Sequence, residues 1–113
     1  MYVRMVFFEF KPESVGDAIQ LFRNGVIPGA KKQKGYRGAN FMVDRQTGSA
    51  VAMTFWRNEK DALANEENLF FQEQLAKFLP YFASPPVREG YEVSVYVMTG
   101  HAKKRAKRLA KQP

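Results

Sequence analysis

The sequence predicts an α+β fold with the element order β-α-β-β-α-β, the ferredoxin-like or split β-α-β arrangement. Strand-like segments rich in Val, Phe and Tyr lie near both ends of the first 98 residues and as a pair in the middle. Segments with apolar residues at helical spacing separate the first strand from this pair, and the pair from the last strand. This order predicts one antiparallel sheet with helices on one face.

The first strand and the first helix occupy the amino-terminal third of the chain. Residues 2–10 are largely apolar on both strand faces, which predicts a strand that is covered on both sides. Residues 11–14 (Lys-Pro-Glu-Ser) break this strand and are typical of a helix start. The first helix is indicated by apolar residues at Val15, Ile19, Phe22 and Val26. We expect an interruption at Pro28–Gly29.

A hairpin and a broken helix follow. Residues 36–44 and 49–56 are strand-like, and the turn-forming residues between them predict a hairpin. Asn58 is a suitable N-cap for a second helical region that ends near residue 65. A third helix is expected from about residue 68, with an apolar stripe at Phe71, Leu75, Phe78 and Phe82.

The last expected strand comprises residues 87–98, after a Ser-Pro-Pro break at residues 84–86 that should end the third helix.

Helices cover only one face of the expected sheet, yet the first and third strands are apolar on both faces. An exposed apolar sheet face would be an aggregation hazard. We therefore expect a homodimer in which the sheets of two copies pack face to face.

The positive charge of the protein is concentrated at the carboxyl end. The 113 residues include 18 Lys and Arg against 11 Asp and Glu, a net charge of +7. Six of the 18 cations are Lys103, Lys104, Arg105, Lys107, Arg108 and Lys111. Removing these six leaves 12 basic and 11 acidic residues, so the remainder is nearly neutral. We expect a folded domain at residues 1–99 and a basic, helical tail at residues 100–113.

Several classes of site are excluded by composition. The chain has no Cys, and its one His, His101, lies in the tail, so we expect neither a metal site nor a Ser-His type of nucleophile. Neither phosphate-binding glycine pattern occurs. No apolar run approaches the length of a membrane span, and the first ten residues do not resemble a signal peptide. We expect a cytoplasmic protein.

Several short motifs resemble a known family. They are Gly35–Tyr36–Arg37–Gly38, the Thr54-x-Trp56 strand ending, Asp61–Ala62, Phe71–Gln72–Glu73 and Tyr91–Glu92–Val93. Together with the order of elements, they resemble the antibiotic biosynthesis monooxygenase-like proteins of the dimeric α+β barrel superfamily. The resemblance covers about residues 2–98. It implies a homodimeric barrel and, as one activity, the oxidation of a planar phenol or quinone-type molecule in an apolar pocket without a bound cofactor.

Specific activities of this superfamily depend on residues that differ here. In haem-degrading members, the resemblance would place the ligand His at Leu75, the pocket Asn near Phe8 and the helix Trp near Asn65. All three residues differ, so haem degradation is not expected. The quinone-forming monooxygenases carry an Asn four residues before the Trp that ends the third strand. This chain has Trp56 but carries Ala52 at the earlier position.

Three residues are candidates for a catalytic role: Trp56, Asn40 and Tyr91. Trp56 is suited to stack on a planar substrate, and the alternative is a core side chain at a strand end. Tyr91 has a phenol for proton transfer, although Tyr is also a good strand former. Asn40 is a poor strand former in mid-strand, which indicates either a functional position or an edge or bulge position.

A pocket would also need residues that bind the substrate. We expect these to be Trp56, Arg4, Phe71, Leu75 and Met53. Arg4 lies among apolar residues of the first strand, so its charge requires a carboxylate partner from the protein or from a ligand. A structural pair with Glu92 or Glu9 is the favoured interpretation.

Two hypotheses of function follow. The first is a small enzyme that oxidises a planar aromatic molecule with O2. The second is a non-catalytic binding or regulatory homodimer whose basic tail contacts an anionic partner such as nucleic acid or anionic lipid. The tail contains no aromatic residues for base stacking, which disfavours nucleic acid, and a solvated helix is the simpler interpretation of its charge.

Overall fold

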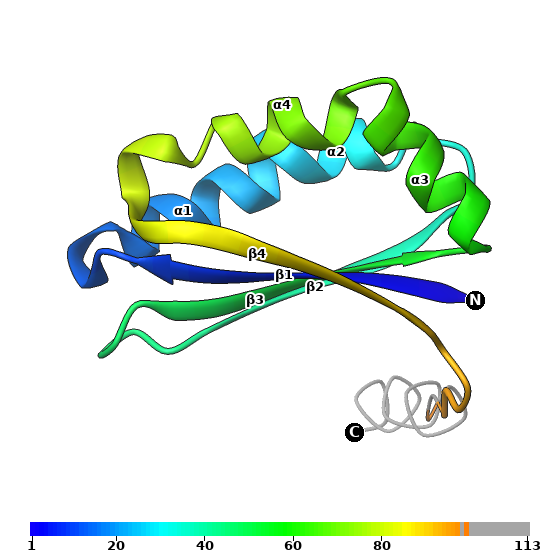
Figure 1. Ribbon diagram of the computed structural model, residues 1–113. Helices are drawn as coiled ribbons and strands as arrows, with labels where there is room; N and C mark the ends of the chain where they lie inside the picture. The colour runs from blue at the N-terminus through cyan, green and yellow to red at the C-terminus, as the bar shows by residue number, and fades with distance from the viewer. Residues whose placement is uncertain (98, 100–113) are drawn as a thin grey trace, which may run out of the picture.

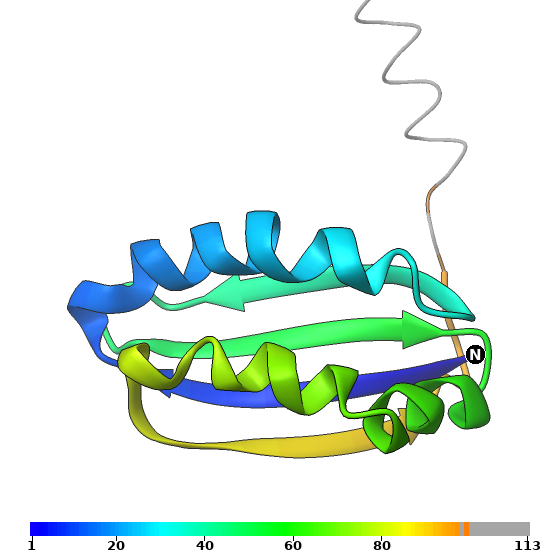
Figure 2. The same cartoon turned by 90° about the horizontal axis from the view of Figure 1, so that it is seen from above.

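The computed structural model of the protein describes residues 1–97 and 99. Within them, four strands form one antiparallel sheet in the spatial order β2-β3-β1-β4. The strands are β1 (Tyr2–Phe10), β2 (Tyr36–Val43), β3 (Ser49–Trp56) and β4 (Phe82–Glu92). The helices lie on one face of this sheet (Figures 1 and 2). The predicted α+β, ferredoxin-like order is confirmed.

The helical layer consists of two broken rods. The first contains α1 (Val15–Leu21), a π-helical turn η2 (Phe22–Val26) and α2 (Ile27–Ala30), after the short 3-10 turn η1 (Pro12–Ser14). The helix is thus interrupted at the π-helical turn, about one turn before the predicted position at Pro28–Gly29. Pro28 lies in the first turn of α2 and has no N–H, so it cannot donate the regular α-helical hydrogen bond to the preceding turn. The second rod contains α3 (Glu59–Glu67) and α4 (Phe70–Ala76), which precede the 3-10 turn η3 (Leu79–Tyr81).

Local signals explain how α3 and α4 begin. The side chain of Asn58 accepts a hydrogen bond from the N–H of Asp61 at 2.8 Å, so the predicted N-cap of α3 is present. Between the two helices, Leu69 adopts a left-handed conformation with φ 68°. Such a residue cannot continue a right-handed helix, and the rod changes direction there. The two-residue link from β3 to α3 brings α3 over the amino-terminal end of β1 (Figure 1).

The prediction for the last strand is wrong in its position. Residues 84–86 do not end a helix but lie inside β4, which begins at Phe82 and ends at Glu92. Among the strands of residues 1–97, β4 pairs only with β1, so it is an edge strand of this sheet, where prolines are tolerated. Beyond it, the N–H of Val93 bonds the carbonyl of Met1 at 2.8 Å, and the Tyr96 ring meets Phe55 edge to face at 5.6 Å. The segment thus crosses to the face away from the helices (Figure 1).

The main core lies between the sheet and the helices. Alternate residues of β1 point into it, and the rings of Phe8 and Phe10 stack with centroids 4.8 Å apart. Phe22 from η2 stacks on Phe41 from β2 at 4.6 Å.

Within the described residues, no helix is long and apolar enough to span a membrane.

The opposite face of the sheet has no helical cover in the described part of the chain (Figure 1). Exposed apolar side chains on it come from several strands: Phe7, Met42, Val87 and Tyr91. This agrees with the sequence pattern, in which β1 and β3 are apolar on both faces. The predicted basic tail, residues 100–113, lies outside the described residues.

Candidate functional site

A narrow apolar pocket opens between the sheet and the helical layer, with a cavity volume of about 50 Å³. Alternate residues of β1 and β3 form its floor, and α4 forms much of its wall. The remaining wall comes from η2, α2 and the turn after α4. The lining residues are Arg4, Val6, Phe8, Phe22, Val26, Ala30, Ala52, Thr54, Trp56, Phe70, Phe71, Gln74, Leu75 and Phe78. Arg4 is the only charged residue among them.

Trp56 is both a core side chain at a strand end and a ring that lines the pocket, the two alternatives that the sequence left open. Its side chain is fully buried at the end of β3, and its indole N–H donates a hydrogen bond to the hydroxyl oxygen of Thr54 at 3.0 Å. It packs edge to face against Tyr36 at 6.0 Å. The same ring also lines the pocket. Trp56 is therefore a fixed core side chain that presents an aromatic surface to the cavity.

Arg4 lies at one end of the pocket and is only 4% exposed. Its guanidinium carbon lies 5.2 Å from the ring centroid of Trp56 and 4.1 Å from that of Phe71. Both distances are within the range of cation–π contacts. The cation of Arg4 thus contacts an aromatic ring from β3 and another from α4.

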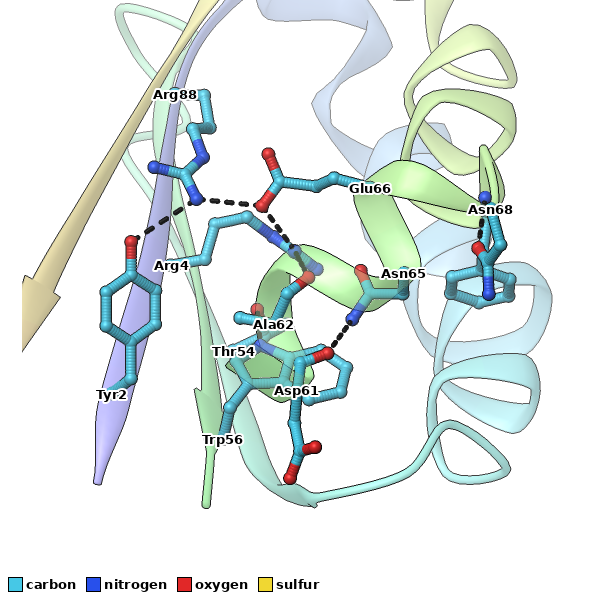
Figure 3. A network of polar contacts seen from close by, with 11 residues as sticks. Tyr2, Arg4, Thr54, Trp56, Asp61, Ala62, Asn65, Glu66, Asn68 and Arg88 are labelled. Carbon is cyan, nitrogen blue, oxygen red and sulfur yellow. Dashed lines mark hydrogen bonds and ion pairs between the residues drawn. The ribbon is translucent and has the colours of Figure 1, made fainter. Parts of the chain in front are cut away.

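The carboxylate partner of Arg4 is Glu66 of α3, and not Glu9 or Glu92 as the sequence suggested. Nη1 of Arg4 donates to Oε2 of Glu66 and to the carbonyl of Ala62, each at 3.2 Å (Figure 3). Glu9 lies on the opposite face of β1, where both its carboxylate oxygens accept from the Ser49 hydroxyl at 2.9 Å. Glu92 is the exposed last residue of β4. The prediction failed because the position of α3 over β1 depends on tertiary packing.

A second arginine shares the same carboxylate. Nη2 of Arg88, on β4, donates to Oε2 of Glu66 at 2.7 Å and to the hydroxyl of Tyr2 at 3.3 Å (Figure 3). Two cations therefore converge on one anion, and one of these cations, Arg4, lines the pocket. Sequence reasoning missed both Glu66 and Arg88. Arg88 pairs with Val6 across the strands, so this register places it on the helical face of the sheet.

The pKa values of the two arginines shift in opposite directions. Burial lowers the pKa of Arg4 to about 10, although attraction to Glu66 opposes the shift. Burial also acts to lower the pKa of Arg88, but hydrogen bonds to Glu66 and Tyr2 outweigh it and raise that pKa. Arg88 is the more exposed of the two, which explains the different balance. Both side chains carry a charge at neutral pH.

The structure brings together four of the sequence-predicted site residues: Trp56, Arg4, Phe71 and Leu75. Phe71 and Leu75 lie one helical turn apart on α4. The neighbouring pocket residues Phe70, Gln74 and Thr54 were not among those predicted. No sequence motif points to Gln74, whereas Phe70 adjoins the predicted Phe71.

Three other candidates lie on the opposite face of the sheet. Asn40 is exposed and pairs directly with Met53, which is half-buried there. Tyr91 is also exposed, and its hydroxyl donates to Glu89 at 2.8 Å. This hydrogen bond raises the pKa of the Tyr91 phenol. Because side chains alternate between sheet faces, none of these three residues lines the pocket.

The arrangement can bind and orient a planar molecule, but it offers few groups for proton transfer. No Asp, Glu, His or Tyr is among the lining residues within the described part of the chain. In the same described residues, no group of His, Cys, Asp and Glu side chains is suited to hold a metal ion. The six basic residues proposed as an arm lie outside the residues that the structure describes.

Comparison with solved structures supports the fold. A monooxygenase from the ActVA-Orf6 gene of Streptomyces coelicolor, in complex with nanaomycin D, is 18% identical, with a TM-score of 0.69 over 88% of this chain and 92% of that chain. SnoaB from Streptomyces nogalater, a cofactor-independent oxygenase, is 10% identical, with a TM-score of 0.65 over 85% and 95%. NE2512 from Nitrosomonas europaea, of unknown function, is 17% identical, with a TM-score of 0.68 over 88% and 94%.

Among curated proteins, none matches this chain. At these identities, the solved structures establish the fold alone. The sequence itself gives the more specific result, because the family model for antibiotic biosynthesis monooxygenases matches residues 1–77, which contain β1 to β3, α3 and the whole of α4. The chain therefore belongs to the antibiotic biosynthesis monooxygenase family.

Proposed function

We propose that the protein binds a planar aromatic molecule in the pocket beside Trp56 and oxidises it with O2, without a bound cofactor. The observation that carries this proposal is the convergence of Trp56, Phe71 and Arg4 on one apolar cavity. Aromatic walls favour a flat ring, and the single cation gives the ring a preferred orientation.

Two structural relatives support the choice of chemistry. The Streptomyces coelicolor protein is a monooxygenase that binds nanaomycin D, and SnoaB is a cofactor-independent oxygenase. The balanced reaction is that of a phenol with O2 to give a quinone and water. One oxygen atom enters the ring and the other leaves as water with two hydrogens from the substrate. The phenol supplies the electrons, so the reaction needs no further reductant.

The contribution of the chain is positioning and exclusion of water. No carboxylate or imidazole lines the cavity in the described residues, so the phenol proton passes to solvent. Trp56 and Phe71 hold the ring plane, and the apolar wall keeps bulk water from the reacting carbon.

The pocket must widen to admit a ring. A cavity of about 150 Å³ is known to hold benzene, whereas this one measures about 50 Å³. The wall best suited to move is α4, which has no fully buried residue and follows the left-handed Leu69. We expect Phe70 and Phe71 to move outward with α4 when a ligand enters.

The test is aerobic turnover of mono- and bicyclic phenols with isotopically labelled O2, followed by mass spectrometry of the product. We expect one labelled oxygen atom per quinone. Trp56→Phe keeps the core filled and should lower kcat/KM by about tenfold or more, because it removes part of the stacking surface. Leu79→Ala is the control, because Leu79 is exposed on η3 and belongs neither to the pocket lining nor to the open sheet face. Equal loss in both variants would exclude this pocket as the site, and binding without turnover would favour the non-catalytic alternative.

We also propose that two copies associate through the open sheet face. Phe7, Met42, Val87 and Tyr91 are 37–56% exposed there, which is unusual for side chains of this size on one face of a sheet. Packing two such faces together would bury them in a symmetric interface.

A further inference from the structure

We infer that Arg4 is an oxyanion-binding residue, and that the pocket selects planar aromatic molecules whose ring carries a negatively charged oxygen, either an ionised hydroxyl or a carboxylate. The inference rests on the proposed function, because it identifies the class of ligand for the same pocket. It concerns recognition and adds no chemical step.

The charges around Arg4 do not balance. Arg4 and Arg88 share the single carboxylate of Glu66, and the other hydrogen-bonding groups in the cluster, Tyr2 and the Ala62 carbonyl, are neutral. The cluster therefore has one excess positive charge. A buried charge without a counterion is costly, and a ligand anion would neutralise it.

Arg4 has more hydrogen-bond donors than it uses within the described residues. Arginine has five N–H donors, and both recorded bonds of Arg4 start from Nη1. Within the part of the chain that the structure describes, Nε and Nη2 donate no hydrogen bond to another residue. Since Arg4 lines the pocket, these donors are available to a bound oxyanion.

The position of Arg4 in the pocket would also orient a ligand. The guanidinium lies near the rings of both Trp56 and Phe71, and the rest of the lining is apolar. A flat ligand beside Trp56 would need a hydrogen-bonding partner for its polar end. Arg4 is the one charged group in the described lining that can provide it. A neutral ligand would leave the excess charge unpaired, so the pocket discriminates against it.

The test compares matched pairs of probes by isothermal titration calorimetry. Benzoate is paired with benzamide, and 4-nitrophenolate with 4-nitroanisole, so that each pair differs mainly in charge. The first pair represents a carboxylate and the second an ionised hydroxyl. We expect each anion to bind the wild-type protein about tenfold or more tightly than its neutral partner. The pair with the larger preference identifies the source of the oxyanion.

Arg4→Met is the principal variant, because it leaves Glu66 and Arg88 as a balanced pair and keeps an apolar stem in the pocket. It should abolish the preference for the anion and leave affinity for the neutral probe within about threefold. Arg45→Met removes the same charge from an exposed turn at the other end of the sheet and should change neither affinity. Arg4→Lys should retain part of the preference.

The wild-type comparison decides the inference even if Arg4→Met fails to fold. Equal affinity for charged and neutral probes in both pairs would overturn it, as would undiminished anion binding by Arg4→Met. Oxidation of neutral substrates without any charge preference would refute this inference and leave the proposed function standing. An Arg4-dependent charge preference without turnover of any phenol would refute the oxidation and uphold the role of Arg4.

Discussion

The guanidinium carbon of Arg4 lies 4.1 Å from the centroid of the Phe71 ring, so the one charged group in the pocket wall formed by the described residues is covered by α4. An aromatic ring of the protein thus occupies a position that the ring of a ligand could take. Ligand entry and movement of α4 are expected to be coupled for this reason.

Phe71→Ala tests this coupling. Removal of the half-buried ring should cost about 2 kcal/mol of unfolding free energy, through lost apolar contacts and the lost cation–π contact. It should also enlarge the cavity and speed the association of benzoate several-fold. Stopped-flow fluorescence of Trp56, the only Trp in the chain, measures the association rate, and urea unfolding measures stability. An unchanged association rate would argue against α4 as the gate.

Glu66→Gln should destabilise the fold strongly. The substitution leaves Arg4 and Arg88 close together with no anion between them, and the loss of one partner of a buried pair costs about 3 kcal/mol. Partial exposure of Arg88 places the expected loss toward the lower part of the measured range for such pairs. Glu67→Gln is the matched control, because its side chain is exposed on the next position of α3, and it should change stability by less than about 0.5 kcal/mol. Similar losses in both variants would contradict the role given to Glu66.

Anion binding should weaken at high pH. Arg4 is cationic below its pKa of about 10, so benzoate affinity should stay constant from neutral pH and fall as the pH rises through that value. The charged and titratable groups that face Arg4 are Glu66 from α3, Arg88 from β4 and Tyr2 from β1. The affinity of Arg4→Met should lack the fall that Arg4 causes. If both proteins lose affinity in parallel, another group is responsible.

The open sheet face provides a test of self-association. Val87→Glu places a charge opposite Phe7, its cross-strand neighbour, and should convert a dimer into a monomer in size-exclusion chromatography with light scattering. Leu79→Glu is the control, since Leu79 is more exposed than Val87 but belongs to η3 and not to the sheet. A mass that stays dimeric in Val87→Glu would assign the interface to another surface.

The sequence was sufficient for the fold because local signals agreed with one another. Strand patterning, the Asn58 cap and the spacing of apolar residues all favoured the observed order, and the alternation along β1 places Arg4 on the same face as Phe8. These signals act over a few residues and need no knowledge of tertiary packing.

The site was less predictable because it depends on contacts between distant segments. Glu66 and Arg4 are 62 residues apart, and their pairing requires the direction in which α3 crosses β1. Asn40 was chosen for its low strand propensity, which does not indicate the sheet face on which a residue lies. Tyr91 and Met53 were assigned to the site on residue type, and the strand register places both on the face away from the pocket.

The two prolines of β4 have a consequence for how copies of the chain can meet. Pro85 and Pro86 lie on an edge strand and lack the N–H groups that a further strand would need. Chain-to-chain extension of the sheet is blocked along this part of the edge, which protects a strand rich in apolar residues from forming fibre-like stacks. Such a chain can expose an apolar sheet face for partner binding and still resist edge-to-edge aggregation along β4.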